Sequence, residues 1–180
     1  MTRLELEHLI RAAASVADED ELVVIGSQAV LGQFPDAPAE LLRSVEADLY
    51  PRHAPGKADL IDGSIGEGSP FHDAFGYYAQ GVGPETAVLP AGWEVRLIPI
   101  SNANTRHATG WSVEIHDLAI SKYVAGRKKD RSFIRAAIAH RMVDRGTLLD
   151  RLAVTPLDAE RRALIAAGIE RDFREAAAGE

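Results

Sequence analysis

The chain of 180 residues has no cysteine and only two methionines. A disulfide framework, a thiol nucleophile and a zinc–thiolate site are therefore excluded. No apolar run reaches the roughly 20 residues that a membrane-spanning helix needs, and no secretory signal is visible at the N-terminus. We therefore expect a protein without membrane contact, located in the cytoplasm. Internal repeats and low-complexity segments are also missing, which favours one compact unit.

Lysine is scarce, with four lysines against sixteen arginines, and the net charge is −7. An acidic protein has little general attraction for nucleic acid. The charge is uneven, however, because residues 122–141 carry seven basic side chains and one acidic side chain. This stretch is either a solvated helix face or a patch that attracts phosphates or an acidic partner.

Apolar residues make up 46% of the chain, which is enough for a hydrophobic core. Their spacing predicts a helix at the start of the chain and then buried or alternating strands. After residue 110 it predicts helices alone. This order indicates an α+β fold, with an α/β core at 1–110 and a helical part at 111–180. Residues 71–79 fit neither pattern. The expected strands are 22–25, 44–50 and 93–100, and the expected helices are 3–17, 116–126, 130–143, 146–154 and 156–169.

The dipeptide Gly26-Ser27 stands between the apolar run 22–25 and a short helical pattern. Glycine at this point lets the backbone turn tightly and lets a ligand approach closely. The free N–H groups of a helix start, together with the Ser27 hydroxyl, would suit the phosphates of a nucleotide. A plain strand–helix turn is the alternative interpretation.

The expected strand 44–50 carries two acids, Glu46 and Asp48. Side chains two positions apart on a strand share a face, while Val45, Ala47 and Leu49 would face the core. Neighbouring carboxylates repel each other unless a cation lies between them, and Mg²⁺ is bound by one or two carboxylates plus phosphate oxygens. The alternative is the polar outer face of an edge strand.

This part of the chain resembles the opening motif of the nucleotidyltransferase fold, because a buried strand is followed by Gly26-Ser27, a short helix and a strand with paired acids. In that fold Gly-Ser is followed by Asp-x-Asp, and here the first acid is Glu46. The resemblance implies a small mixed sheet flanked by helices. It also implies that Glu46 and Asp48 bind Mg²⁺, with Asp48 as a catalytic residue.

The segment from His116 to Asp130 resembles the Lys-helix and the Arg-x-Lys-Asp element of AbiEii-like nucleotidyltransferases. That family includes toxins of bacterial toxin–antitoxin systems. The resemblance implies that Lys122 lies near the triphosphate and that Asp130 is needed for activity. Gly26, Ser27, Lys122 and Arg127 would then bind the nucleotide.

Lys122 can also be considered from the sequence pattern alone. Lys122 lies in a mostly apolar helix, where an ammonium is costly unless it meets a carboxylate or phosphate. A solvent-directed or structurally paired lysine is the alternative. In the nucleotidyltransferase fold a third metal carboxylate usually lies on a later strand, so the resemblance makes Glu94 the candidate, with Asp62 as its rival.

The implied function is Mg²⁺-dependent transfer of a nucleotidyl group from an NTP to an acceptor hydroxyl. The acceptor stays open among a tRNA end, a protein and a small molecule. A toxin would also bind a cognate antitoxin protein. The alternative is a nucleotide- or protein-binding module of the same fold that has lost catalysis, as the glutamate at position 46 suggests.

Overall fold

The structure is a computed structural model that describes residues 1–178. The chain divides into two compact units. The first comprises Met1–Ala87 and Arg96–Glu114, and the second comprises Val88–Val95 and the chain from Ile115 onward. All strands lie in the first unit, and the four long helices after residue 114 lie in the second. The predicted α+β class with a helical C-terminal half is therefore confirmed.

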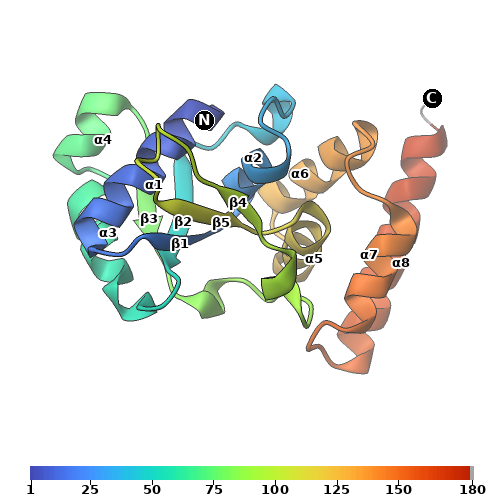
Figure 1. Cartoon of the computed structure of the whole chain (residues 1–180). Coiled ribbons are helices and arrows are strands. Elements are labelled where there is room, and N and C mark those ends of the chain that lie inside the picture. Colours follow the sequence, from blue (N-terminus) through green and yellow to red (C-terminus); the bar gives the residue numbers. More distant parts are fainter. Residues whose placement is uncertain (179–180) are drawn as a thin grey trace. The chain divides into compact units, whose positions relative to one another are not determined.

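The first unit is built on a mixed sheet with the strand order β3-β2-β1-β5-β4 (Figure 1). The β1–β2 and β4–β5 pairs are antiparallel, whereas β1–β5 and β2–β3 are parallel. The central strand β1 therefore has β2 on one side and β5 on the other. The strands are β1 (Glu21–Ile25), β2 (Glu46–Pro51), β3 (Tyr78–Gly81), β4 (Ile98–Ile100) and β5 (Thr109–Ser112).

Helices flank this sheet, as predicted. α1 packs against β1, β2, β3 and β5 with α3 beside it, and α2 packs against β4 and β5. Apolar residues at helical spacing give α1 a buried face, on which Leu6, Leu9 and Ile10 are fully buried. The helices are α1 (Arg3–Ala17), α2 (Val30–Gln33), α3 (Ala58–Ile65) and α4 (Pro70–Phe75), with 3₁₀ helices at Ser27–Ala29, Ala39–Leu41, Pro55–Lys57 and Pro84–Thr86.

The second unit is helical. α5 contacts each of the other three helices, and α8 contacts α6 and α7. The predicted helices are confirmed in number and order, although α8 continues beyond the expected end at residue 169. Among residues 1–178, none of the helices combines the length and the apolar character that crossing a bilayer requires. The helices are α5 (Ile115–Ala125), α6 (Lys128–Ala139), α7 (Arg145–Ala153) and α8 (Ala159–Ala178).

The strand predicted at 93–100 is confirmed only for its last three residues, and its first part is wrong. After Gly92, which has φ +74°, the chain forms a 3₁₀ helix at Trp93–Arg96. Val95 is 88% exposed, so the alternating apolar residues do not face a core here. The strand β4 starts only at Ile98. It lies at the edge of the sheet and pairs with a neighbour on one side only, so Pro99, which has no N–H to donate, is tolerated there.

Two short strands, β3 and β5, were not predicted. The ambiguous residues 71–79 divide into the end of α4 and the start of β3. β5 contains Gly110, which weakens the strand signal of the sequence. A Cβ at this position would meet Ile10 Cδ1 of α1 at 2.4 Å. Glycine is present because the helix packs closely on the strand.

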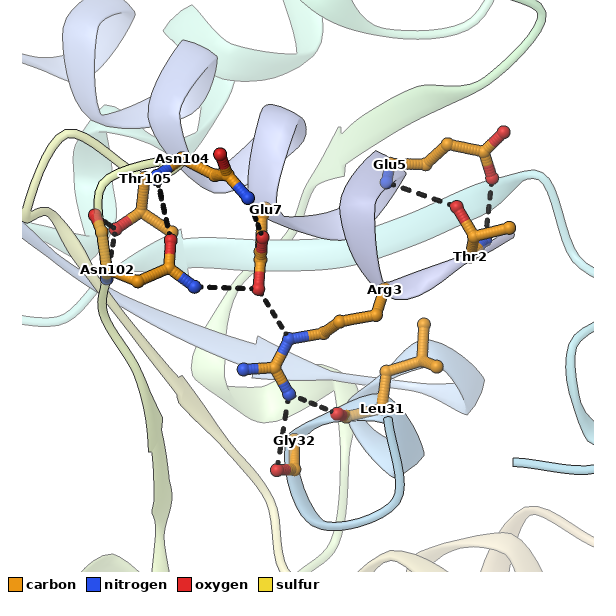
Figure 2. A network of polar contacts seen from close by, with 9 residues as sticks. All are labelled: Thr2, Arg3, Glu5, Glu7, Leu31, Gly32, Asn102, Asn104 and Thr105. Atoms are coloured by element: carbon orange, nitrogen blue, oxygen red, sulfur yellow. Dashed lines mark hydrogen bonds and ion pairs between the residues drawn. The ribbon is translucent and has the colours of Figure 1, made fainter. Parts of the chain in front are cut away.

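A buried carboxylate connects α1 to two other parts of the first unit (Figure 2). Glu7 is 4% exposed and accepts hydrogen bonds from Arg3 Nε, Asn102 Nδ2 and Asn104 Nδ2, each at 2.9 Å. The Arg3 guanidinium also donates to the carbonyls of Leu31 and Gly32 in α2. The network therefore fixes α2, the helix that follows Gly26-Ser27, against α1 and the loop before β5.

The charge of Glu7 makes this network dependent on pH. Burial alone would raise the pKa of Glu7, but the hydrogen bonds from Asn104, Asn102 and Arg3 outweigh burial and lower the pKa below its ordinary value of 4.5. A carboxyl whose folded-state pKa is lowered stabilises the fold above its unfolded-state pKa. This contribution is lost as the pH falls through the folded-state value.

We expect Glu7→Gln to lower the free energy of unfolding by about 2 kcal/mol at pH 7, because a charged acceptor of three hydrogen bonds is lost. The difference from wild type should shrink as the pH falls below 4.5. Urea unfolding of both proteins at several pH values measures it. Glu5→Gln is the control and should stay near wild type, since glutamine also serves in the capping box with Thr2. An E7Q deficit that does not change with pH would contradict this account.

Candidate active site

The first motif lies where β1 ends. Gly26 has φ +68° and ψ −170°, a backbone conformation that is almost restricted to glycine. The antiparallel register places Ile25 opposite Asp48 of β2. A Cβ on Gly26 would lie 1.9 Å from Asp48 Oδ2, far inside van der Waals contact. Glycine is therefore required both by the backbone and by the carboxylate beside it.

A 3₁₀ helix, Ser27–Ala29, starts directly after Gly26 and leads into α2. Gln28 within it is fully buried, and its side-chain amide donates to the Ser44 carbonyl at 3.1 Å. This bond joins the Gly-Ser turn to the chain just before β2. Sequence reasoning missed Gln28. The available signal was a polar side chain directly before the apolar residues 29–31.

Glu46 and Asp48 lie on one face of β2, both partly exposed. Ala47 and Leu49 are fully buried on the opposite face, as alternation predicts. Val45 was expected to face the core as well, and this is wrong: it is 47% exposed because β2 begins only at Glu46. The structure thus brings Gly26, Ser27 and the two acids together at one end of the β1–β2 pair.

Tyr78 was not predicted as part of this site. It lies on β3 opposite Glu46, and its hydroxyl donates to Glu46 Oε2 at 2.9 Å. The pKa of Tyr78 is raised to about 12, first by burial and then by the hydrogen bond to Glu46 and the charge of that residue. The charges of Glu67 and Asp48 raise it further. The phenol therefore keeps its proton and orients the Glu46 carboxylate. No signal for Tyr78 was visible in the sequence, since residues 71–79 had no clear pattern.

The donor set of β2 fits Mg²⁺. Two carboxylates on one face supply hard oxygen ligands, and Mg²⁺ commonly takes one or two carboxylates and completes its shell with water and phosphate oxygens. Over residues 1–178, no cluster of three or more His, Cys, Asp or Glu side chains has the arrangement of a metal site. A bound ion would thus depend on Glu46, Asp48 and oxygens of the ligand.

Glu94, the expected third ligand, is exposed on the 3₁₀ helix Trp93–Arg96 instead of on a strand. It belongs to the segment Val88–Val95 of the second unit, whereas Glu46 and Asp48 belong to the first. Its rival Asp62 is exposed on α3. The assignment of Glu94 as a metal ligand stays a prediction.

In the second unit, three of the predicted residues meet around one carboxylate. Asp130 has no exposed surface, and its Oδ2 accepts from Arg127 Nε at 2.7 Å and from the Arg127 backbone N–H at 3.2 Å. Lys122 is 5% exposed, with Nζ 3.4 Å from Asp130 Oδ1 and 4.5 Å from the centre of the Phe133 ring. The positive φ of Gly126, +66°, lets the chain turn from α5 into α6 so that these residues meet.

Asp130 is held in its ionised form. Burial alone would raise the pKa of Asp130. The effect of burial is outweighed by the side-chain hydrogen bond from Arg127, by the charges of Lys122 and Arg127 and by the hydrogen bond from the Arg127 backbone N–H, so the pKa is lowered. Asp130 therefore acts as an acceptor that fixes two cations, and not as a proton donor. The three side chains together carry one positive charge, which suits a phosphate group.

The sequence profile of one protein family, described as "nucleotidyltransferase of unknown function" (DUF6036), matches residues 4–164. The chain belongs to this nucleotidyltransferase family. The matched range includes Gly26, both acids of β2, Lys122 and Asp130. The match confirms the predicted nucleotidyltransferase family, while the AbiEii-like subtype and the roles of these residues stay predictions. Neither the search of curated proteins nor that of solved structures found a match.

In this nucleotidyltransferase-family protein, we expect Gly26→Ala to lower the free energy of unfolding by at least about 2 kcal/mol, because the strained backbone and the clash with Asp48 add up. The clash depends on the carboxylate, so the same substitution should cost less in an Asp48→Ala background. Urea unfolding of the four proteins of this double-mutant cycle measures the coupling. Equal costs in both backgrounds would show that Asp48 does not occupy the space beside Gly26.

We expect Asp130→Ala to lower the free energy of unfolding by about 3 kcal/mol, because a buried ammonium loses a carboxylate partner. Asp150→Ala, at an exposed position of α7, is the matched control and should change little. Thermal and urea unfolding compare the variants. A stable D130A protein would mean that the pairing with Lys122 adds nothing to the fold.

Proposed function

We propose that this protein is a Mg²⁺-dependent nucleotidyltransferase, which transfers a nucleotidyl group from an NTP to an acceptor hydroxyl. The observation that carries this proposal is the placement of Asp48 against Gly26, where β1 passes into the 3₁₀ helix Ser27–Ala29. Membership of a nucleotidyltransferase family supports it.

Within the first unit, Glu46 and Asp48 would hold the ion. Mg²⁺ bound there would neutralise phosphate charge and lower the pKa of the acceptor hydroxyl. Tyr78 keeps the Glu46 carboxylate in a fixed orientation through the 2.9 Å hydrogen bond. The Ser27 hydroxyl, at the start of the 3₁₀ helix, would donate to a phosphate oxygen of the nucleotide.

Within the second unit, we assign Lys122 to the neutralisation of charge on the departing pyrophosphate. Asp130 would fix this ammonium and the Arg127 guanidinium, the second nucleotide-binding cation. Both assignments are supported by the ion pairs of Asp130 with Lys122 and Arg127, which hold the two cations side by side. A tRNA end, a protein hydroxyl or a small-molecule hydroxyl would each serve as acceptor. A role as a toxin with a cognate antitoxin stays a prediction of the resemblance.

One observation favours a second candidate. The Tyr78 hydroxyl occupies one oxygen of the glutamate at position 46. This carboxylate would then have less capacity to bind metal, as in a nucleotide- or protein-binding module without catalysis. Such a module would bind an NTP without releasing pyrophosphate. Turnover therefore separates the two candidates.

We expect calorimetric titration to show NTP binding that requires Mg²⁺ and weakens roughly tenfold or more in Asp48→Asn, since a charged metal ligand is lost. All four NTPs are tested with Mg²⁺ and with EDTA. Asp59→Asn removes one negative charge from an exposed position of α3 and is the matched control. It should bind like wild type.

Three results of this experiment have distinct meanings. Metal-dependent binding together with pyrophosphate release supports the enzyme, and binding without release in the presence of total tRNA and cell protein supports the module. Equal binding by wild type and D48N would exclude Asp48 as the metal ligand. No binding of any NTP would contradict the enzyme and the nucleotide-binding module, and would leave only a protein-binding module of the same fold.

A further inference from the structure

Three basic residues, Lys128, Lys129 and Arg131, lie together at the start of α6 and form the α6 basic cluster. All three side chains are exposed. The chain has only four lysines and carries 27 acidic against 20 basic residues, so two lysines at adjacent positions are an unusual concentration of positive charge. None of the three has a role in the nucleotidyl transfer proposed above.

The acid between these residues does not offset their charge. Asp130 has no exposed surface, and its oxygens accept from Arg127 and Lys122. Within the described part of the chain, residues 1–178, no ion pair joins a member of the α6 basic cluster to an acid. The three positive charges therefore face solvent.

The cluster lies where a helix is least tolerant of cations. Its members belong to the first turn of α6, which follows Arg127 as the N-cap. The N-terminus of a helix carries a partial positive charge, so cations there weaken the helix and acids strengthen it. Cations kept at positions where folding favours acids indicate a function that is served at some cost in stability. An anion that binds them is such a function.

The cluster does not line a cavity. The second unit has a cleft of about 720 Å³ and a cavity of about 220 Å³, and other residues line both of them. Small ligands are normally held in concave sites that surround them. Cations on an exposed helix start instead suit an extended polyanion, which presents successive charges along a surface.

A nucleic acid fits this surface better than an acidic protein does. The large apolar side chains of α6, Phe133, Ile134 and Ile138, are buried, and among residues 1–178 the large apolar side chains that are exposed all lie outside α6. Protein interfaces are centred on apolar and aromatic anchors with a polar rim. Contacts with a phosphate backbone are made by lysine and arginine and need no such anchor.

We propose that the α6 basic cluster binds the phosphate backbone of a single-stranded RNA. One helix turn, about 5.4 Å long, is short against the grooves of a duplex and suits a few phosphates of one strand. Among the acceptors considered above, an RNA end is the one that carries a phosphate backbone. The proposal therefore makes RNA the acceptor, and this part of it rests on the proposed function.

The transfer to RNA has a defined balance of bonds. The terminal hydroxyl oxygen of the RNA bonds to the α-phosphorus of the NTP, and the bond from that phosphorus to the β-phosphate oxygen breaks. Pyrophosphate leaves, and the hydroxyl proton passes to solvent. The α6 basic cluster takes no part in these steps and serves only to hold the strand.

The test is a fluorescence anisotropy titration of a labelled, unstructured RNA of about 12 nucleotides, in EDTA and without NTP. Wild type should bind this RNA. The double variant Lys128→Gln/Lys129→Gln should bind at least about tenfold more weakly at low salt, and the slope of log K against log salt should become shallower by about 0.7 for each cation removed. Arg174→Gln is the matched control, because it removes one positive charge from an exposed position of α8 beside the cleft that follows α6.

Two measurements separate binding from folding. The double variant should unfold at the temperature of wild type or at a higher one, because cations are removed from the first turn of a helix. It should also bind Mg²⁺–NTP like wild type, since Lys122 and Arg127 are retained. Wild-type RNA affinity in the double variant would overturn the proposal, as would an equal loss in R174Q or the absence of RNA binding by wild type.

Competition identifies the kind of polyanion. Unlabelled RNA should displace the labelled strand at lower concentrations than poly-glutamate or a DNA strand of the same sequence. Equal competition by poly-glutamate would indicate an acidic protein partner, and tighter binding of DNA would indicate a different nucleic acid. Either result would overturn the assignment to RNA.

A second assay separates this proposal from the nucleotidyl transfer. With Mg²⁺ and NTP, wild type should lengthen the labelled RNA, and the double variant should show a higher KM for RNA. RNA binding without pyrophosphate release under any condition would retain the surface and contradict the transfer. Pyrophosphate release by a protein that neither binds nor lengthens RNA would retain the transfer and overturn the proposal.

Discussion

The first unit depends on the contact between a carboxylate and a position without a side chain. Asp48 Oδ2 lies where a Cβ of residue 26 would otherwise be. The backbone at Gly26 is in a conformation that other residues avoid. The turn out of β1, the direction of the following 3₁₀ helix and the position of the acid are therefore determined together. Gln28 and the Glu7 network then hold the elements on either side of this contact.

The second unit depends on the ion pairs of one buried carboxylate. A lysine and an aspartate with almost no exposed surface are each costly to desolvate, and the arrangement is tolerable because Asp130 faces two cations at once. The excess of one positive charge leaves the group suited to an anion.

Much of the fold followed from periodicity. α1 and β1 have strong apolar patterns, and their residues were predicted within one position. The Gly26–Asp48 juxtaposition was predictable because a strand, a glycine and a paired-acid strand form a recognisable order. The strand expected around Glu94 did not form, because alternation in a short exposed segment has the same appearance as alternation in a strand, and only burial distinguishes them.

Other features depend on tertiary context, which a single sequence does not carry. Tyr78 reaches Glu46 because β3 pairs with β2 in a particular register, and four residues of β3 are too few to show a pattern. Gly110 lies in a strand because α1 packs closely against it, a reason that is invisible in a strand of low β-propensity. The left-handed conformation of Arg141 was likewise hidden, since the sequence pattern favoured a helix that continued through this residue.

The pairing of β1 with β2 also has a consequence for how the chain finds its native state. A slip of the register by one residue would move every side chain of β2 to the opposite face. Glu46 and Asp48 would then enter the hydrophobic core without partners. Ala47 and Leu49, which are fully buried in the native register, would face solvent. Such a misfolded sheet would be far less stable than the native one. The acids that we assign to metal binding would thus also favour the native register during folding, because only the correct alignment of the two strands keeps them out of the core.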